Sequence, residues 1–200
     1  KYAYDRGIIP PERLSVSVET AGGVRAARLY KRNGIVRAAE VAMGRARFES
    51  VAVPVELPVP RVLDYAVDVG RGYRITCVNV GNPHAVAFVE DVDTLDVASE
   101  GPLLEHAPIF PERVNAEFVR VLDETTLRMR VWERGSGETW ACGTGACAAV
   151  AAAVENGLCA TDTDIAVKVP GGVLSVRYSS DGSLRMRGEI DLVFEGVVEL

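Results

Sequence analysis

The sequence has few of the residues that build metal sites and disulfide frameworks. It contains 2 histidines and 4 cysteines among 200 residues. The cysteines are irregularly spaced, and none of them forms a Cys-x-x-Cys pair. Paired cysteines are typical of zinc sites, and dense cysteine patterns are typical of small secreted domains. We therefore expect no metal and predict a cytoplasmic protein with free thiols.

Long apolar runs and a basic stripe are also absent from the sequence. No segment reaches the ~20 consecutive apolar residues that a membrane-spanning helix needs, and we expect no signal peptide. The formal net charge is −6, with acidic and basic residues mixed along the chain. These features disfavour a membrane protein and a nucleic-acid-binding protein. The 48% hydrophobic and 25% charged residues are typical of a globular protein.

Two tracts of the chain repeat one order of glycines and extended segments. Each has a glycine, an extended run, a Gly-Gly pair, a second run, an Asn-Gly or Asp-Gly turn and a third run. The first tract comprises Gly7, residues 14–20, Gly22-Gly23, residues 24–30, Asn33-Gly34 and residues 35–43. The second comprises Gly157, residues 165–169, Gly171-Gly172, residues 173–178, Asp181-Gly182 and residues 184–187. Such turns between alternating runs predict β-hairpins, so we expect two copies of one unit.

The second tract is preceded by a clear helical segment. Residues 146–155 are mostly Ala, Val and Cys, and Asn156-Gly157 follows as a C-cap. A helix that is apolar all round is typical of a buried helix. Cys142 precedes Gly157 by 15 residues, and the same step back from Gly7 falls before Lys1. Residues 1–6 resemble the end of the equivalent first helix, so we expect the first half to be truncated.

These patterns predict an α+β fold with two pseudo-symmetric halves, the first of them truncated. Each half is expected to be a mixed or antiparallel sheet wrapped around a central apolar helix. We expect residues 1–56 and 189–200 to be the remnant of the N-terminal half, and residues 57–188 to be the C-terminal half, which carries Cys142. The remaining strands are expected at residues 74–80, 84–89, 114–122, 126–132 and 190–200.

Cys142 is the main candidate for chemistry. A thiol at a helix N-terminus faces unpaired N–H groups and the positive end of the helix dipole, which favour the thiolate. Gly143, Thr144 and Gly145 leave room for a substrate near N–H groups that suit a carboxylate. A buried structural cysteine is the alternative, and it is the common fate of a free cysteine. The flanking glycines favour function for Cys142, whereas Cys147 is expected to belong to the core.

Four polar residues near expected turns suit an amino-acid ligand. Arg134 offers a fork of donors for a carboxylate, and Glu133 can accept from an ammonium group. Asn82 and Asn115 each offer a donor and an acceptor. Taken alone, Glu133 and Arg134 could equally form a solvated ion pair, and residues 81–84 could be only a turn. Together these residues favour a ligand with charged amino-acid groups.

Three motifs in the second half of the chain resemble those of the diaminopimelate epimerase family, and they occur in the family's order. They are Gly81-Asn82-Pro83-His84, then Phe110-Pro111-Glu112-Arg113-Val114-Asn115, and then Trp132-Glu133-Arg134-Gly135-Ser136-Gly137-Glu138-Thr139-Trp140-Ala141-Cys142-Gly143-Thr144-Gly145-Ala146-Cys147. Residues 4–7 and 194–196 also resemble the end of the family's first central helix and its closing strand. The resemblance covers essentially the whole chain, and the long third motif is highly specific.

The resemblance implies a cofactor-independent epimerisation of LL-diaminopimelate to meso-diaminopimelate, a step towards lysine and peptidoglycan precursors. The family uses no pyridoxal phosphate and no metal. Two cysteines face opposite sides of the substrate α-carbon, and one thiolate removes the proton while the other thiol returns one. Cys142 would be one of this pair, supported by His84 and Glu133. A cleft between the halves would hold the substrate.

The resemblance also implies which residues bind the substrate. Asn82, Asn115, Glu133 and Arg134 would hold its distal amino-acid end. The N–H groups of Gly143 and Thr144 would hold the reacting carboxylate. The expected partner is a small amino-acid substrate, with no nucleic acid and no membrane, and the oligomeric state stays open between a homodimer and other assemblies.

The family's first half-site, a Cys-Gly-Asn-Gly motif, has no counterpart in this sequence. We therefore expect the 200-residue chain by itself to be inactive. Two alternatives stay open beside the diaminopimelate reaction. One is a racemase of another amino acid on the same fold, and the other is a non-catalytic ligand-binding remnant.

Overall fold

The computed structural model describes residues 1–20 and 23–198, and the chain forms two compact units. The first unit comprises residues 1–42 with 187–200, and the second comprises residues 43–186. The proline-rich residues 54–60 lie inside the second unit. The division into evolutionary halves at residues 56 and 188 stays a prediction.

The first unit contains a three-stranded antiparallel sheet and a short helix. Its elements are α1 (Tyr2–Asp5), β1 (Ser15–Thr20), β2 (Gly23–Arg32) and β3 (Ile35–Arg45), the last of which runs on into the second unit. The predicted turn between β2 and β3 has a positive φ at both central residues, 52° at Asn33 and 79° at Gly34. Such a turn follows the right-handed twist of the strands, which is why Asn-Gly joins hairpins. Gly22 lies outside the described residues.

The second unit contains one mixed sheet. Its elements are η1 (Ser50–Ala52), β4 (Tyr65–Val67), β5 (Tyr73–Asn79), β6 (Pro83–Phe88), α2 (Val97–Glu105), β7 (Asn115–Asp123), β8 (Thr126–Glu133), β9 (Gly137–Thr139), α3 (Gly143–Glu155), β10 (Asp164–Val169), β11 (Gly172–Tyr178) and β12 (Ser183–Glu189), the last of which runs on into the first unit. The strand order is β12-β11-β10-β8-β7-β6-β5-β4, and β9 pairs with β8. The pairs β10–β8 and β6–β7 are parallel, whereas β4–β5, β5–β6, β7–β8 and β10–β11 are antiparallel. The predicted α+β class is therefore confirmed.

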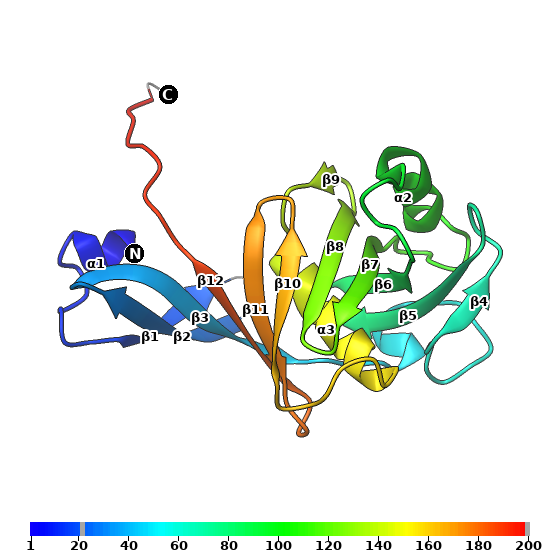
Figure 1. The fold of residues 1–200 in the computed structure, drawn as a ribbon, viewed down its shortest axis with the longest axis horizontal. Helices are drawn as coiled ribbons and strands as arrows, with labels where there is room; N and C mark the ends of the chain where they lie inside the picture. Colours follow the sequence, from blue (N-terminus) through cyan, green and yellow to red (C-terminus); the bar gives the residue numbers. More distant parts are fainter. Residues whose placement is uncertain (21–22, 199–200) are drawn as a thin grey trace. The chain divides into compact units, whose positions relative to one another are not determined.

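Helix α3 lies against the sheet of the second unit (Figure 1). All residues from Gly145 to Ala153 are buried, and they pack against apolar side chains of β5, β6, β7, β8, β10 and β11. Its C-terminus has the predicted cap, because the N–H groups of Gly157 and Leu158 donate to Val154 and Ala153 at 2.9 Å and 2.8 Å. These two hydrogen bonds, together with Gly157 at a positive φ of 72°, form a Schellman motif. Because α3 is held in the core by this packing, the position of its first residue, Gly143, is also fixed.

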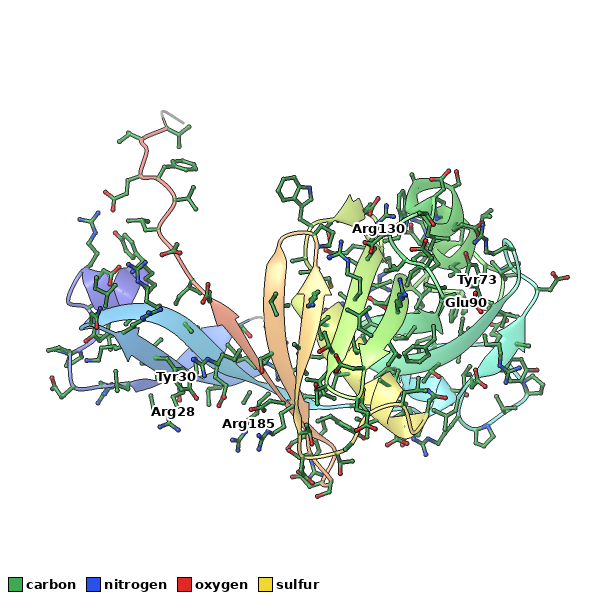
Figure 2. All side chains as sticks on the ribbon, in the orientation of Figure 1. Arg28, Tyr30, Tyr73, Glu90, Arg130 and Arg185 are labelled. Carbon is green, nitrogen blue, oxygen red and sulfur yellow. The ribbon has the colours of Figure 1, made fainter. Side chains whose placement is uncertain are left out.

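A second apolar cluster lies on the other face of the sheet, next to α2. Tyr73, labelled in Figure 2, belongs to this cluster. Its hydroxyl donates to Glu100 of α2 at 2.9 Å. The sequence did not predict α2, because Gly101 and Pro102 lie inside it. Both residues normally argue against a helix interior, although Pro102 is still within the first two turns.

The predicted last strand, residues 190–200, is wrong for the residues described. Residues 190–198 form no strand, and residues 199–200 lie outside the described part of the chain. Only the N–H of Ile190 continues the pairing, donating to Arg37 at 3.0 Å. The apolar side chains of Val193, Phe194 and Val197 are exposed, which explains why alternation alone misled the prediction. Among the described helices, none is long and apolar enough to cross a membrane.

Candidate active site

Cys142 is the N-cap residue of α3 and is 6% exposed. Its Sγ accepts from the N–H of Gly145 at 3.3 Å and lies 3.5 Å from the Thr144 hydroxyl. Gly143 and Thr144 form the first turn of the helix, where N–H groups cannot reach a carbonyl one turn earlier. The structure thus places the thiol at a helix N-terminus, as the sequence predicts.

The ionisation of Cys142 differs from the prediction. Burial, reinforced by the negative charge of Glu117, raises the pKa of this thiol to about 11. The hydrogen bonds from Thr144 and Gly145 favour the thiolate, but they do not offset the loss of water. The backbone N–H of Gly145 favours the thiolate, as expected for a helix N-terminus, but burial outweighs this effect and the pKa of Cys142 stays above its ordinary value.

A buried carboxylate and imidazole lie in the sheet next to the start of α3. Both Glu117 of β7 and His84 of β6 are fully buried, and Glu117 Oε1 lies 2.7 Å from His84 Nδ1. The other ring nitrogen, Nε2, lies 2.9 Å from Asn82 Oδ1. Within the described residues, Glu117 Oε2 has no hydrogen-bond partner. Burial raises the pKa of Glu117, and the neighbouring His84 opposes that rise.

Gly145 brings this pair close to the thiol. A Cβ atom added at Gly145 would lie 2.8 Å from Glu117 Oε1 and 3.2 Å from Cys142 Sγ. Glu117 Oε1 and Cys142 Sγ therefore lie no more than 6.0 Å apart, the sum of these distances. Real Cβ contacts below 3.0 Å are essentially absent from proteins, so only glycine fits without a shift of its neighbours. The second glycine of the Cys-Gly-Thr-Gly motif is therefore required by the packing of the site.

Asn115 clamps the segments on either side of it. Its Nδ2 donates to the Pro83 carbonyl at 2.8 Å, and its Oδ1 accepts from the Arg134 N–H at 2.9 Å. The Arg134 side chain donates to the Glu112 carbonyl at 2.9 Å, and Glu133 accepts from the Thr139 hydroxyl. The three sequence motifs are thus brought together by hydrogen bonds in one unit.

Two buried carboxylates near the motifs were missed by the sequence analysis. Glu117 was missed because a single acidic residue in a strand usually faces water, and its partner His84 lies 33 residues away. Glu105, 3% exposed, accepts from Trp132 Nε1 at 2.6 Å and from the Gly135 N–H at 2.9 Å. Glu105 therefore supports the loop that follows β8, and both of its oxygens have partners.

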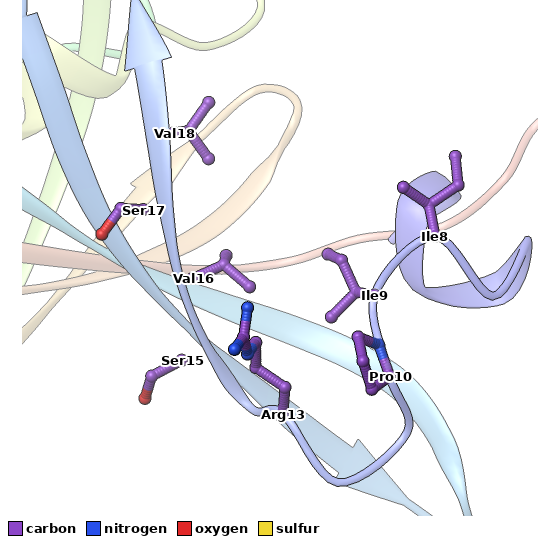
Figure 3. A pocket seen from close by; sticks show the side chains of 8 residues that line it. All are labelled: Ile8, Ile9, Pro10, Arg13, Ser15, Val16, Ser17 and Val18. Carbon is purple, nitrogen blue, oxygen red and sulfur yellow. The ribbon is translucent and has the colours of Figure 1, made fainter.

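Other parts of the described chain offer less chemistry. A hollow of about 600 Å³ in the first unit is lined by Ile8, Ile9, Pro10, Arg13 and side chains of β1, and it contains none of the predicted site residues (Figure 3). Across the described residues, no group of three or more His, Cys, Asp or Glu side chains could hold a metal ion. The candidate site is therefore the group around Cys142.

Comparisons with known proteins agree with the motifs. The family model for diaminopimelate epimerase matches residues 76–193, which is more than half of the chain. Among curated relatives, the diaminopimelate epimerase of Pelotomaculum thermopropionicum is 44% identical over 197 residues, covering 98% of this chain and 69% of the relative. That of Acetivibrio thermocellus is 41% identical over 203 residues, covering 100% of this chain and 71% of the relative.

Solved structures share the fold at low sequence identity. A hydroxyproline epimerase from Agrobacterium vitis matches with a TM-score of 0.70 and 16% identity, covering 94% of this chain and 60% of that chain. A probable proline racemase from Agrobacterium radiobacter matches with a TM-score of 0.69 and 16% identity, covering 94% and 61%. This chain thus spans about 60% of these two solved chains. With the motifs joined around Cys142 and relatives above 40% identity along nearly all of its length, the chain belongs to the diaminopimelate epimerase family.

Proposed function

We propose that this chain supplies one half-site of a cofactor-independent epimerase that converts LL-diaminopimelate to meso-diaminopimelate. The observation that carries the proposal is the placement of Cys142. Its thiol caps a buried helix, and Gly145 in the first turn of that helix lies against both the thiol and the Glu117 carboxylate that pairs with His84. A structural cysteine would need no such polar neighbours. Action in the cytoplasm stays part of this proposal.

The proposed reaction uses two thiols on opposite sides of the substrate α-carbon. A thiolate on one side takes the α-proton, and the thiol on the other side gives a proton to the resulting carbanion. At the end of the reaction the two sulfurs have exchanged protonation states. Because burial raises the pKa of Cys142 to about 11, we expect Cys142 to be a thiol near neutral pH. That form suits it to give the proton.

The remaining predicted residues have proposed binding roles. The N–H groups of Gly143 and Thr144 would bind the α-carboxylate, where they also stabilise the charge that develops when the α-proton leaves. Asn82, Glu133 and Arg134 would bind the distal amino-acid end, together with Asn115. His84 and Glu133 would support the thiol of Cys142 from neighbouring positions.

The experiment that tests this function is α-hydrogen exchange in deuterated water. LL- and meso-diaminopimelate are incubated with the longest natural protein that contains this sequence, and deuterium uptake is followed by mass spectrometry. We expect exchange with inversion, reduced at least about 100-fold by Cys142→Ala because a positioned proton-transfer group contributes about that much or more. Cys159→Ala is the matched control, since Cys159 is also buried but has Asp123 and Glu124 as its charged neighbours.

Other outcomes of the exchange experiment would point to other functions. Exchange with a different amino acid, in the absence of exchange with diaminopimelate, would indicate a racemase on the same fold. No exchange with any amino acid would contradict an epimerase and favour a ligand-binding protein. The 200-residue chain alone should show no epimerisation, because the other described cysteines, Cys77, Cys147 and Cys159, are buried and none of them caps a described helix as Cys142 does.

A further inference from the structure

The Glu117–His84 pair is the feature of this site that the proposed roles leave unexplained. A fully buried carboxylate is costly, and buried polar atoms nearly always have partners. Yet within the described chain Glu117 Oε2 has no hydrogen-bond partner, and Oε1 is paired with the ring of His84. Glu117 lies on the face of the sheet that packs against α3, where Val119 of the same strand joins the apolar cluster. An apolar residue would fill this place at lower cost, so stability alone does not explain Glu117.

The hydrogen-bond partners of His84 indicate its protonation. Both ring nitrogens face oxygen acceptors, Nδ1 a carboxylate at 2.7 Å and Nε2 the Asn82 amide oxygen at 2.9 Å. A ring that donates on both sides is an imidazolium ion, and 2.7 Å is typical of a charge-assisted bond. The same heavy-atom geometry also fits a second form, in which the proton has moved from Nδ1 to Oε1 and both groups are neutral.

The sulfur of Cys142 affects the choice between these two forms. Because Oε1 lies within 6.0 Å of Sγ, a thiolate would face the negative carboxylate of the charged form. Moving the proton from Nδ1 to Oε1 removes the negative charge next to the sulfur without bringing any proton from outside. The other titratable groups that influence this cluster are Glu133 at the end of β8, Cys77 on β5 and Cys147 on α3.

We propose that Glu117 is a positioning residue that acts through His84: the pair holds one proton, which lies on His84 when Cys142 is a thiol and on Glu117 when Cys142 is a thiolate. Glu117 thereby orients the imidazole and controls how readily the thiol ionises. The assignment rests on the proposed function, because the thiol matters only where Cys142 transfers a proton. It adds Glu117, which was not among the predicted site residues, to the residues proposed for that function.

The first test is the rate at which iodoacetamide alkylates Cys142 at pH 8, measured by peptide mass spectrometry. Glu117→Gln keeps the size and can donate to Nδ1, but it cannot carry a negative charge. We expect Cys142 to react at least about threefold faster in this variant, which corresponds to a fall of half a pKa unit. The pH profile of the reaction should shift to lower pH by the same amount. A residue that only fills space would leave both unchanged.

Two controls accompany this substitution. Cys159 in the same molecule should keep its alkylation rate, since Glu117 does not influence it. Glu105→Gln is the matched variant, because Glu105 is also buried but both of its oxygens have hydrogen-bond partners, Trp132 and the Gly135 N–H. It should leave the Cys142 rate unchanged. A Cys142 rate in Glu117→Gln equal to that of the unsubstituted protein would overturn the proposal.

The second test needs no substitution and covers the case in which Glu117→Gln does not fold. The chain has 2 histidines, so the nitrogen signals of His84 and the exposed His106 can be assigned directly in a ¹⁵N-histidine sample. We expect His84 to show two protonated ring nitrogens, because both of them face oxygen acceptors. A His84 ring with a single protonated nitrogen would overturn the proposal. Neither test needs a substrate, so absence of α-hydrogen exchange would contradict only the proposed function.

Discussion

Asn115 shows how one side chain can hold two segments of a site in register. Its amide group donates to one backbone segment and accepts from another, so the roles of its nitrogen and oxygen cannot be exchanged. At 4% exposure, water cannot replace either bond. The predicted role of Asn115 in substrate binding remains a proposal, but its two hydrogen bonds already explain why an asparagine occupies this position.

Asn115→Asp should destabilise the protein by about 2 kcal/mol. The carboxylate can still accept from the Arg134 N–H, but it cannot donate to Pro83, whose carbonyl would face a negative charge in a buried place. The free energy of unfolding in urea at pH 7.5 measures the effect. Asn33→Asp is the control, because Asn33 lies in an exposed turn with φ 52° that aspartate tolerates. Equal stability of the two variants would contradict the clamp.

The site residues differ in how far the sequence could reveal them. Cys142, Asn82, Asn115 and Arg134 lie in motifs, and local patterns were enough to single them out. Glu117 has no local pattern, because its meaning comes from a partner on the next strand and from a helix start that reaches it only in the folded chain. The ionisation of Cys142 was also beyond the sequence, since it depends on how deeply the thiol is buried.

At the scale of elements, α3 is the part most tightly constrained by volume. Its residues from Ala146 to Ala153 are all fully buried, and six of these eight are alanine. Small side chains let the sheet approach the helix closely on all sides. Larger side chains have no room there, because protein interiors are packed as densely as organic crystals.

Ala149→Leu should destabilise the protein by about 1–3 kcal/mol, because it forces three extra carbons into a filled interior. The midpoint of urea unfolding, with the slope unchanged, is the measurement. Ala98→Leu is matched to it, since Ala98 is an exposed alanine of α2 and leucine is nearly as good a helix former. Equal and small losses of stability in both variants would contradict dense packing around α3.

The elements themselves were largely predictable, and the failures have physical causes. The expected helix at residues 146–155 begins three residues earlier, at Gly143, because two glycines concealed its first turn. The strands around the Asn-Gly and Asp-Gly turns agree within a few residues with β2, β3, β11 and β12. The segment after residue 190 alternates like a strand, but in the described residues it lacks the partner bonds that a strand needs.

At the scale of the whole molecule, the buried thiols make stability depend on alkaline pH. Burial raises the pKa of Cys142 from its ordinary 9.0 to about 11 and that of Cys147 to about 12, and it raises the pKa of Cys77 further. The folded protein therefore holds these protons more tightly than the unfolded chain. Below pH 9 both states are protonated, so the full stability is present. Above pH 9 only the unfolded chain loses protons, and stability falls.

We expect the free energy of unfolding to fall by about 1 kcal/mol between pH 9 and pH 10 for each such thiol, because the unfolded thiol goes from half ionised to almost fully ionised over this range. Urea unfolding at pH 7.5, 9.0, 9.5 and 10.0 gives the slope. Cys142→Ser should reduce the slope by the share of one thiol. A slope that is zero, or that is unchanged by this substitution, would show that Cys142 is far less buried in solution.

The alanine composition of α3 also has an entropic consequence. A long side chain loses rotamer freedom when it is buried, at a cost of up to about 2 kcal/mol, whereas alanine and glycine have no such freedom to lose. Helix α3 can therefore be immobilised with almost no loss of side-chain entropy. The same property leaves it few alternative packings, since a methyl group has no other rotamer to adopt. The thiol of Cys142, the N-cap residue of α3, is therefore held by a helix whose side chains have few alternative conformations.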